Sequence, residues 1–256
     1  MKSTTGSTYS APRDRAGRFR LVVVLGWLAV AAATLAVPEA AAAPRVPAAP
    51  PTGAGAPLAR VQATDMVLHE AAAAGDVALA VYLLEQGAAV DVRSAIDAAT
   101  PLHVAAYAGR IDVVRLLIAK GADIGAHAQG GATPMHMAAL GGHAGIVELL
   151  LSHGADVDTL SNSDSTPLHM AAREGHAKLV ELLLRRGAEI DFRRYYGPTP
   201  LMAAAQTGHV EVVAVLLRNG ADPKPRDASS VTALGLAQAA GHAAIADLLQ
   251  RHGATD

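Results

Sequence analysis

The chain has 256 residues, of which 51% are hydrophobic and 17% are charged, and its formal net charge is −2. This mildly acidic balance argues against a surface that binds nucleic acid through its phosphates, so no nucleic-acid partner is expected. The chain contains no cysteine, which excludes disulfides, cysteine-ligated metals and thiol catalysis.

Residues 1–42 follow the order of a secretory signal peptide. Residues 1–20 are polar and basic, residues 21–37 are uncharged and apolar, and alanines occupy 40–43. This order predicts export and cleavage after Ala42. The alternative is an uncleaved membrane anchor, although the run of 17 apolar residues is at the short limit for a membrane span. In both cases the basic flank predicts that the N-terminus stays cytoplasmic and that the rest of the chain crosses the membrane.

Residues 43–62 are rich in proline, alanine and glycine and carry little apolar bulk. Such a segment cannot bury enough surface to fold. We therefore predict an extended, disordered linker between the export segment and residues 63–256.

A unit of about 33 residues recurs through residues 63–256. Two series of glycines each step by 34 residues once and by 33 thereafter, and a series of threonines keeps the same phase. The series are Gly75, Gly109, Gly142, Gly175, Gly208 and Gly241; Gly87, Gly121, Gly154, Gly187, Gly220 and Gly253; and Thr100, Thr133, Thr166, Thr199 and Thr232. Six units in phase indicate a repeat architecture.

The unit at Thr166–Asp191 predicts a pair of short helices. Thr166 suits an N-cap, and Pro167 suits the first turn, where no amide donor is needed. Gly175 favours the left-handed turn that ends a helix. A second helix with leucines and a valine at amphipathic spacing follows and ends before Gly187. Because neither helix is long enough to be stable alone in water, each unit must bury its apolar face against a neighbour.

Four units open on closely related motifs, TPLHVAA, TPMHMAA, TPLHMAA and TPLMAAA, and each reaches GAD or GAE after its second helix. These motifs resemble ankyrin repeats. The resemblance implies an all-α ankyrin-repeat solenoid of about six helix–turn–helix units with β-turn or hairpin loops. The repeats would span 63–94, 95–127, 128–160, 161–193, 194–226 and 227–256. The structural residues of the motif would be Thr100, Pro101, His103, Thr133, Pro134, His136, Thr166, Pro167, His169, Thr199 and Pro200.

Both end units depart from the motif and are expected to act as caps. The first has MVLHEAA in place of the TPLH opening, and the last has TALG. The single step of 34 places one extra residue in the loop around Arg93–Ala99.

Ten of the eleven histidines keep the phase of the repeat, and only His127 does not. Metal ligands must converge on one ion, whereas these side chains lie about a repeat apart. The resemblance implies structural roles, in which one histidine series joins neighbouring units and another packs at the interhelix turn. We therefore expect no catalytic residue, metal or cofactor. The alternative, an enzyme or metal binder that uses the histidines, would be tested by the metal content of the purified protein.

In ankyrin proteins the partner surface comprises the loop tips before each first helix and the ends of those helices. Carried onto this sequence, the tips are Ile96, Asp97 and Ala99; Gln129 and Ala132; Asn162, Ser163 and Ser165; and Tyr195 and Tyr196. The helix ends are Tyr107, Leu140, Arg173, Glu174 and Gln206, and the residues that close the loops are His127, Leu160 and Arg193.

The strongest single candidate within this surface is Arg193–Tyr196, which includes Arg194, because tyrosine and arginine are frequent binding hot spots. It places two of the five tyrosines side by side in a chain with 3% aromatic residues. The alternative is that Tyr195 and Tyr196 cover the neighbouring loops.

The sequence therefore predicts an exported, non-enzymatic module that binds another protein, with no small-molecule ligand and with residence in the periplasm or outside the cell. One alternative is a membrane-tethered scaffold whose repeats lie on the exported side. Another is a host-directed effector, because ankyrin proteins often serve that way.

Overall fold

The computed structural model describes residues 67–255. The predicted signal peptide and linker, residues 1–42 and 43–62, lie outside this range. All regular secondary structure within the described range is helical, as predicted. Residues 67–74 are helical and precede α3 in the first pair. The later first helices are α4 (Pro101–Tyr107), α6 (Pro134–Gly141), α8 (Pro167–Glu174), α10 (Pro200–Thr207) and α12 (Ala233–Ala239). The second helices are α3 (Val77–Glu85), α5 (Ile111–Ala119), α7 (Ala144–Ser152), α9 (Ala177–Arg185), α11 (Val210–Arg218) and α13 (Ala243–Arg251).

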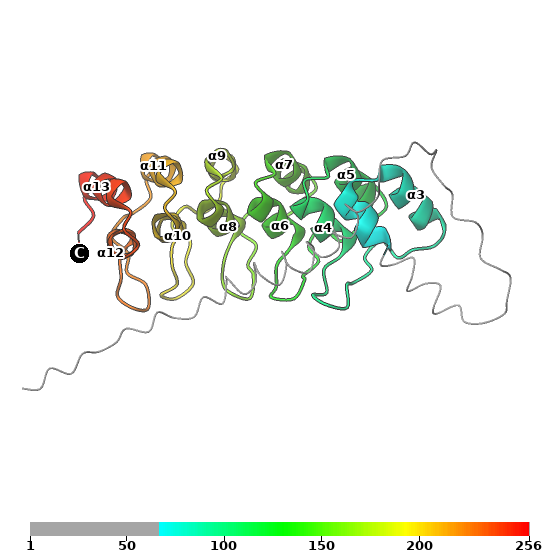
Figure 1. Cartoon of the computed structure of the whole chain (residues 1–256), viewed down its shortest axis with the longest axis horizontal. Coiled ribbons are helices and arrows are strands. Elements are labelled where there is room, and N and C mark those ends of the chain that lie inside the picture. The colour runs from blue at the N-terminus through cyan, green and yellow to red at the C-terminus, as the bar shows by residue number, and fades with distance from the viewer. Residues whose placement is uncertain (1–66, 256) are drawn as a thin grey trace, which may run out of the picture. The chain divides into compact units, whose positions relative to one another are not determined.

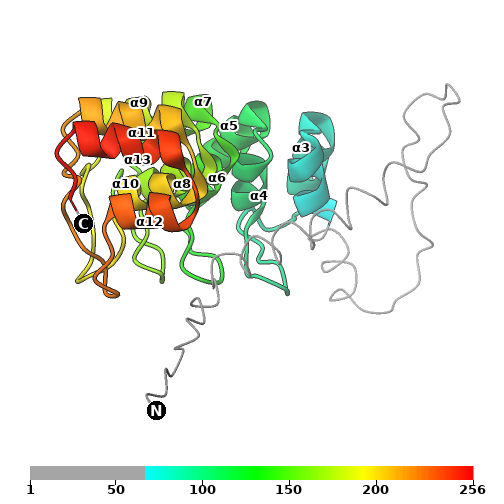
Figure 2. The same ribbon diagram turned by 60° about the vertical axis from the view of Figure 1, so that its left-hand side comes forward.

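The helices from α4 to α13 form two layers. First helices pack beside first helices and second helices beside second helices, and the loops between pairs extend beyond the first-helix layer (Figures 1 and 2). Each pair contacts the pairs before and after it, which is the nearest-neighbour arrangement of a solenoid.

The ends of the helices follow from the residues that the sequence provides. Thr166 is the N-cap of α8, with its side chain accepting from the amide of His169, and Pro167 is the first helical residue. Gly175 ends the helix with φ at 83°, in the left-handed region that only glycine adopts without strain. The predicted roles of Thr166, Pro167 and Gly175 are therefore confirmed.

The buried core draws apolar residues from both helices of every unit, and one large apolar position of the first helix recurs along the row. Leu68, Leu102, Met135, Leu168, Leu201 and Leu234 share this position, and each is at most 1% exposed. Burying such a side chain fully is worth about 1.5–3 kcal/mol. In the first unit, Leu68 belongs to a cluster with Ala80 and Leu83 of α3, and Leu116 of the next unit packs against this cluster.

The loops before α4, α6, α8 and α12 are short hairpins, each closed by a backbone bond from its first residue to the residue before the N-cap threonine. The amide of Ser161 donates to the carbonyl of Ser165 at 3.1 Å, and the first such loop joins Ser94 to Ala99 at 2.9 Å. The first loop therefore spans one residue more than the later one, which confirms where the sequence placed the extra residue.

Candidate functional site

One series of histidines joins each first helix to the loop of the next repeat. In α8, His169 Nδ1 accepts from the amide of Thr166 at 3.2 Å, and Nε2 lies 3.0 Å from the carbonyl oxygen of Pro198. His103 and His136 make the equivalent bonds, to Ala132 and Ser165. These hydrogen bonds therefore fix the position of each loop relative to the first helix of the preceding repeat.

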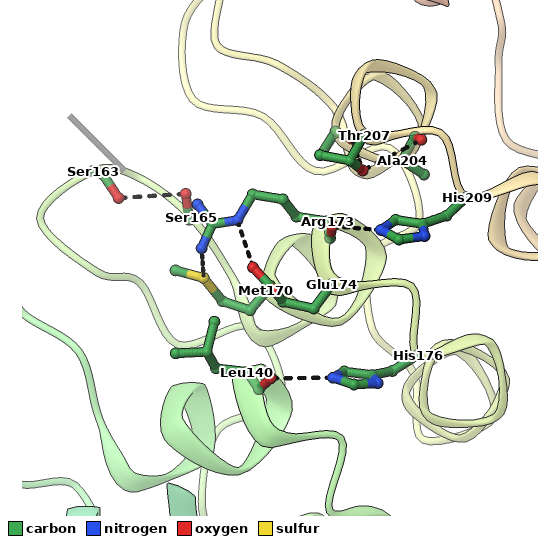
Figure 3. Close-up of polar contacts among 11 residues, drawn as sticks. Leu140, Ser163, Ser165, Met170, Arg173, Glu174, His176, Ala204, Thr207 and His209 are labelled. Carbon is green, nitrogen blue, oxygen red and sulfur yellow. Dashed lines mark hydrogen bonds and ion pairs between the residues drawn. The ribbon is translucent and has the colours of Figure 1, made fainter. Parts of the chain in front are cut away.

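A second series of histidines fixes the ends of the first helices. His176 Nε2 lies 3.1 Å from the carbonyl oxygen of Leu140, and His209 Nε2 lies 2.9 Å from that of Arg173 (Figure 3). His143 and His242 do the same for Tyr107 and Gln206. Four of the five helix-end residues predicted for the partner surface, Tyr107, Leu140, Arg173 and Gln206, therefore occupy equivalent positions in successive repeats.

The side chains of these four residues are accessible to different degrees. Gln206 is exposed, whereas Tyr107, Leu140 and Arg173 are half-buried. The guanidinium of Arg173 is held by Glu174 Oε1, 3.3 Å from Nε, and by Met170 Sδ, 3.4 Å from Nη2 (Figure 3). Arg173 is thus presented in one orientation, which lowers the entropy lost when a partner binds.

The loop tips before α6 and α8 are joined to the preceding tips by backbone hydrogen bonds. The amide of Gln129 donates to the carbonyl of Asp97 at 2.6 Å, and the amide of Asn162 donates to that of Gly130 at 2.9 Å. The tips of these three loops therefore form a continuous row.

Two of the predicted tip residues do not belong to the surface. Ala99 and Ala132 are 6% and 1% exposed, so their prediction as contact residues was wrong. Each directly precedes an N-cap threonine, and its carbonyl oxygen lies within hydrogen-bonding distance of a histidine Nε2, from His69 and His103 respectively. The same geometry that positions the loop buries these alanines.

The residues predicted to close the loops also serve the scaffold. Arg193 is exposed, but its Nη1 donates to the carbonyl of Arg226 in the next loop at 2.9 Å. Leu160 is half-buried. His127 is exposed, as expected of a solvated loop residue, and its Nδ1 lies 3.0 Å from the carbonyl oxygen of Gly131.

The tip between α9 and α10 differs from the others. The amide of Gly197 donates to the carbonyl of Arg194 at 3.0 Å, and Tyr195 has φ at 54°. Tyr195 and Tyr196 are 79% and 70% exposed. They therefore do not cover the neighbouring loops, and the alternative interpretation of this tyrosine pair is wrong.

A proline explains why the left-handed residue of this tip is a tyrosine. In the phase of the repeat, Ala98, Gly131, Asp164 and Ser230 carry the positive φ of their loops. The equivalent residue here is Gly197, which is followed by Pro198. A proline disfavours helical torsions at the residue before it. The left-handed residue therefore lies two positions earlier, at Tyr195.

Arg194 extends the exposed tip and is oriented by two neighbours. Its Nη1 lies 3.1 Å from Asp164 Oδ1 in the preceding loop, and its guanidinium carbon lies 5.4 Å from the centre of the Tyr195 ring. The hydrogen bond to Asp164 raises the pKa of Arg194. Asp164 was not among the predicted residues, and its only signal in the sequence is a carboxylate at the preceding tip.

Within residues 67–255, no three metal-ligating side chains lie close enough to hold an ion. In the same range, no helix has the length and apolar character of a membrane span.

Comparison with known families gives one match. The model described as ankyrin repeats (3 copies) matches residues 58–128, 121–194 and 168–256, which together exceed half of the chain. No curated protein matches the chain. Ankyrin repeats generally mediate protein–protein interaction. The family match agrees with the paired helices, the TPLH-type caps and the interhelix glycines described above, and we conclude that the chain belongs to the ankyrin-repeat family.

Proposed function

We propose that the chain is an exported, non-enzymatic module that binds a partner protein through its loop tips and the adjoining ends of its first helices. The observation that carries this proposal is the tip Arg194–Tyr196. Its two tyrosines are 79% and 70% exposed, and a tyrosine that leaves water on binding contributes large contact area at low entropic cost.

The flanking residues extend this anchor into a surface. Arg194 is oriented by Asp164, and Arg173 is oriented by Glu174. Toward the N-terminal end of the row, Ile96 is a second exposed apolar tip, at 73%. Aromatic and arginine anchors with polar neighbours are the usual composition of an interaction hot spot.

Export is supported by the order of residues 1–42, with a basic start, an apolar middle and a small-residue end. On this proposal the mature chain begins at Ala43 and resides in the periplasm or outside the cell. Mass measurement of the N-terminus tests this part. An intact N-terminus in a membrane fraction would instead favour the membrane-tethered scaffold.

The binding proposal is tested with the tagged full chain and a tyrosine-pair variant, Tyr195→Ala/Tyr196→Ala. Tyr82→Ala in α3 is the matched control, because Tyr82 is also a partly exposed tyrosine, at 46%, but lies outside the loop tips. We expect affinity purification to recover the same protein with wild type and with Tyr82→Ala, and to lose it with the double variant. The double variant should melt within about 2 °C of wild type, since surface substitutions change stability by about 0.5 kcal/mol or less.

Two results would contradict the binding proposal. One is undiminished recovery of the protein by the double variant. The other is a large fall in melting temperature, which would assign the tyrosines to the scaffold.

A further inference from the structure

Three of the four histidines that join a first helix to the next loop, His103, His136 and His169, make the backbone hydrogen bonds of a neutral ring. In each, Nδ1 accepts from the backbone amide of the N-cap threonine, at 3.1 Å for His103 and 3.2 Å for His136 and His169. An accepting Nδ1 carries no proton, so the proton of the neutral ring is on Nε2. Nε2 then donates to a carbonyl of the next repeat at 2.9–3.0 Å.

Protonation of any of these rings removes the acceptor of the cap. A protonated Nδ1 would donate to the threonine Oγ1, which lies 2.8 Å away at His103 and 2.9 Å away at His136 and His169. The buried threonine amide, which is itself a donor, would still lose its acceptor. An unsatisfied buried donor costs about 1–3 kcal/mol. The imidazolium would also be buried, because the three residues are 1%, 0% and 5% exposed in the order His103, His136 and His169.

The groups that face these rings do not offset that cost. Arg93 and Asp97 act on His103 with opposite signs, His127 faces His136, and His136 and Arg173 face His169. The ring of Phe192 meets His169 edge-on at 6.3 Å. Burial is the largest influence in each case and lowers the pKa of all three histidines to about 4.

The next junction along the chain, between α10 and α12, has no histidine at this position. Met202 stands where the histidine would be in α10, and the amide of Thr199 donates to its sulfur at 3.4 Å. In α12 the equivalent residue is Gly235. The junction between α10 and α12 therefore contains no titrating ring at this position.

We infer that the junctions held by His103, His136 and His169 form an acid-responsive element, which opens on protonation while the junction at Met202 does not respond. The pKa in the folded chain is below that in the unfolded chain. The stability that the neutral rings contribute is therefore complete above about pH 6.5, falls as the pH drops, and is lost by about pH 4. The junction at His169 also holds the loop that carries Tyr195. The consequence for partner release rests on the proposed function, but the acid response itself does not.

The test measures urea unfolding of the full chain between pH 7.5 and 4, with ring nitrogen NMR of the histidines. The slope of the unfolding free energy against pH gives the number of protons taken up on unfolding. We expect the single variant His136→Met, which copies the residue found in α10, to reduce proton uptake near pH 5 by about one. We expect the reverse variant, Met202→His, to increase it by about one.

The NMR spectra should show the three rings as neutral Nε2–H tautomers at pH 5.5. Rings that titrate near pH 6.5 in the folded chain would overturn the inference. So would unchanged proton uptake in both variants. Met202→His guards against a variant that simply fails to fold, because it adds the pair of bonds that the other junctions already make.

Discussion

Tyr195 is a bulky residue in a backbone conformation that favours glycine. Its φ is 54° and it is 79% exposed, so its side chain gains little from burial. The left-handed conformation costs an L-residue about 1–2 kcal/mol. The contact with the Arg194 guanidinium returns about 0.5–1 kcal/mol at an exposed site. Ala98, Asp164 and Ser230 have similar φ values in their loops, 54°, 55° and 60°, so the conformation belongs to the loop. The exposure of the ring is what supports a role outside the fold.

A pair of substitutions at Tyr195 measures this strain. Tyr195→Gly and Tyr195→Ala both remove the ring, but only glycine accepts the positive φ without strain. We expect the glycine variant to be more stable than the alanine variant by about 1 kcal/mol in urea unfolding.

The same pair of substitutions at Tyr196, whose φ is not positive, is the control. There the alanine variant should be the more stable, because glycine loses more backbone entropy on folding. Equal stabilities at Tyr195 would mean that the turn relaxes to another geometry.

At the scale of the element, the interhelix glycines show how one pair of helices positions the next. A Cβ placed on Gly175 would lie 2.5 Å from His209 Nδ1, and one on Gly142 would lie 2.7 Å from His176. These histidines come from the following repeat, so each glycine allows the next pair to approach. Gly187 has nothing within 4 Å of its Cβ position, although its φ is also positive, at 90°.

Alanine at Gly175 and at Gly187 should therefore have unequal effects. Gly187→Ala should lower the free energy of unfolding by about 1 kcal/mol, because alanine must adopt the left-handed conformation there. Gly175→Ala should lower it by the same amount and by about 1–3 kcal/mol more, because the new Cβ must also displace His209. Urea unfolding of the two variants measures the difference.

The effect on the neighbour can be detected separately. In Gly175→Ala, the hydrogen bond from His209 to the carbonyl of Arg173 should be lost, with a shift in the ring nitrogen resonances of His209. Equal destabilisation by the two substitutions, with His209 unchanged, would mean that the close approach does not hold the repeats together.

At the scale of the whole molecule, the periodic part of the sequence was sufficient to predict the fold. The threonine caps, the two glycine series and one large apolar residue per unit each encode a local feature. Each unit must stack on its neighbours, because it cannot bury its apolar face alone. The position of the extra residue before Ala99 was predicted for the same reason, since an insertion disturbs the phase where it occurs.

The binding surface was predicted less completely. Its location follows from the phase of the repeat, but its geometry depends on interactions that break the phase. Pro198 moves the left-handed residue to Tyr195, and Arg194 pairs with Asp164, a residue 30 positions away. Ala132 was assigned to the surface because it lies in a loop, yet its carbonyl is part of the bond to His103 that buries it.

The central claim is that the face formed by the loop tips and the first-helix ends meets another protein. Site-specific photo-cross-linking tests it most directly. The full chain would carry benzoylphenylalanine in place of Tyr196, of Tyr107 or, as the control outside this face, of Tyr82. We expect one protein to be cross-linked from Tyr196 and Tyr107 and not from Tyr82. Cross-linking of that protein from Tyr82 alone, or of none from Tyr196 and Tyr107, would contradict the claim.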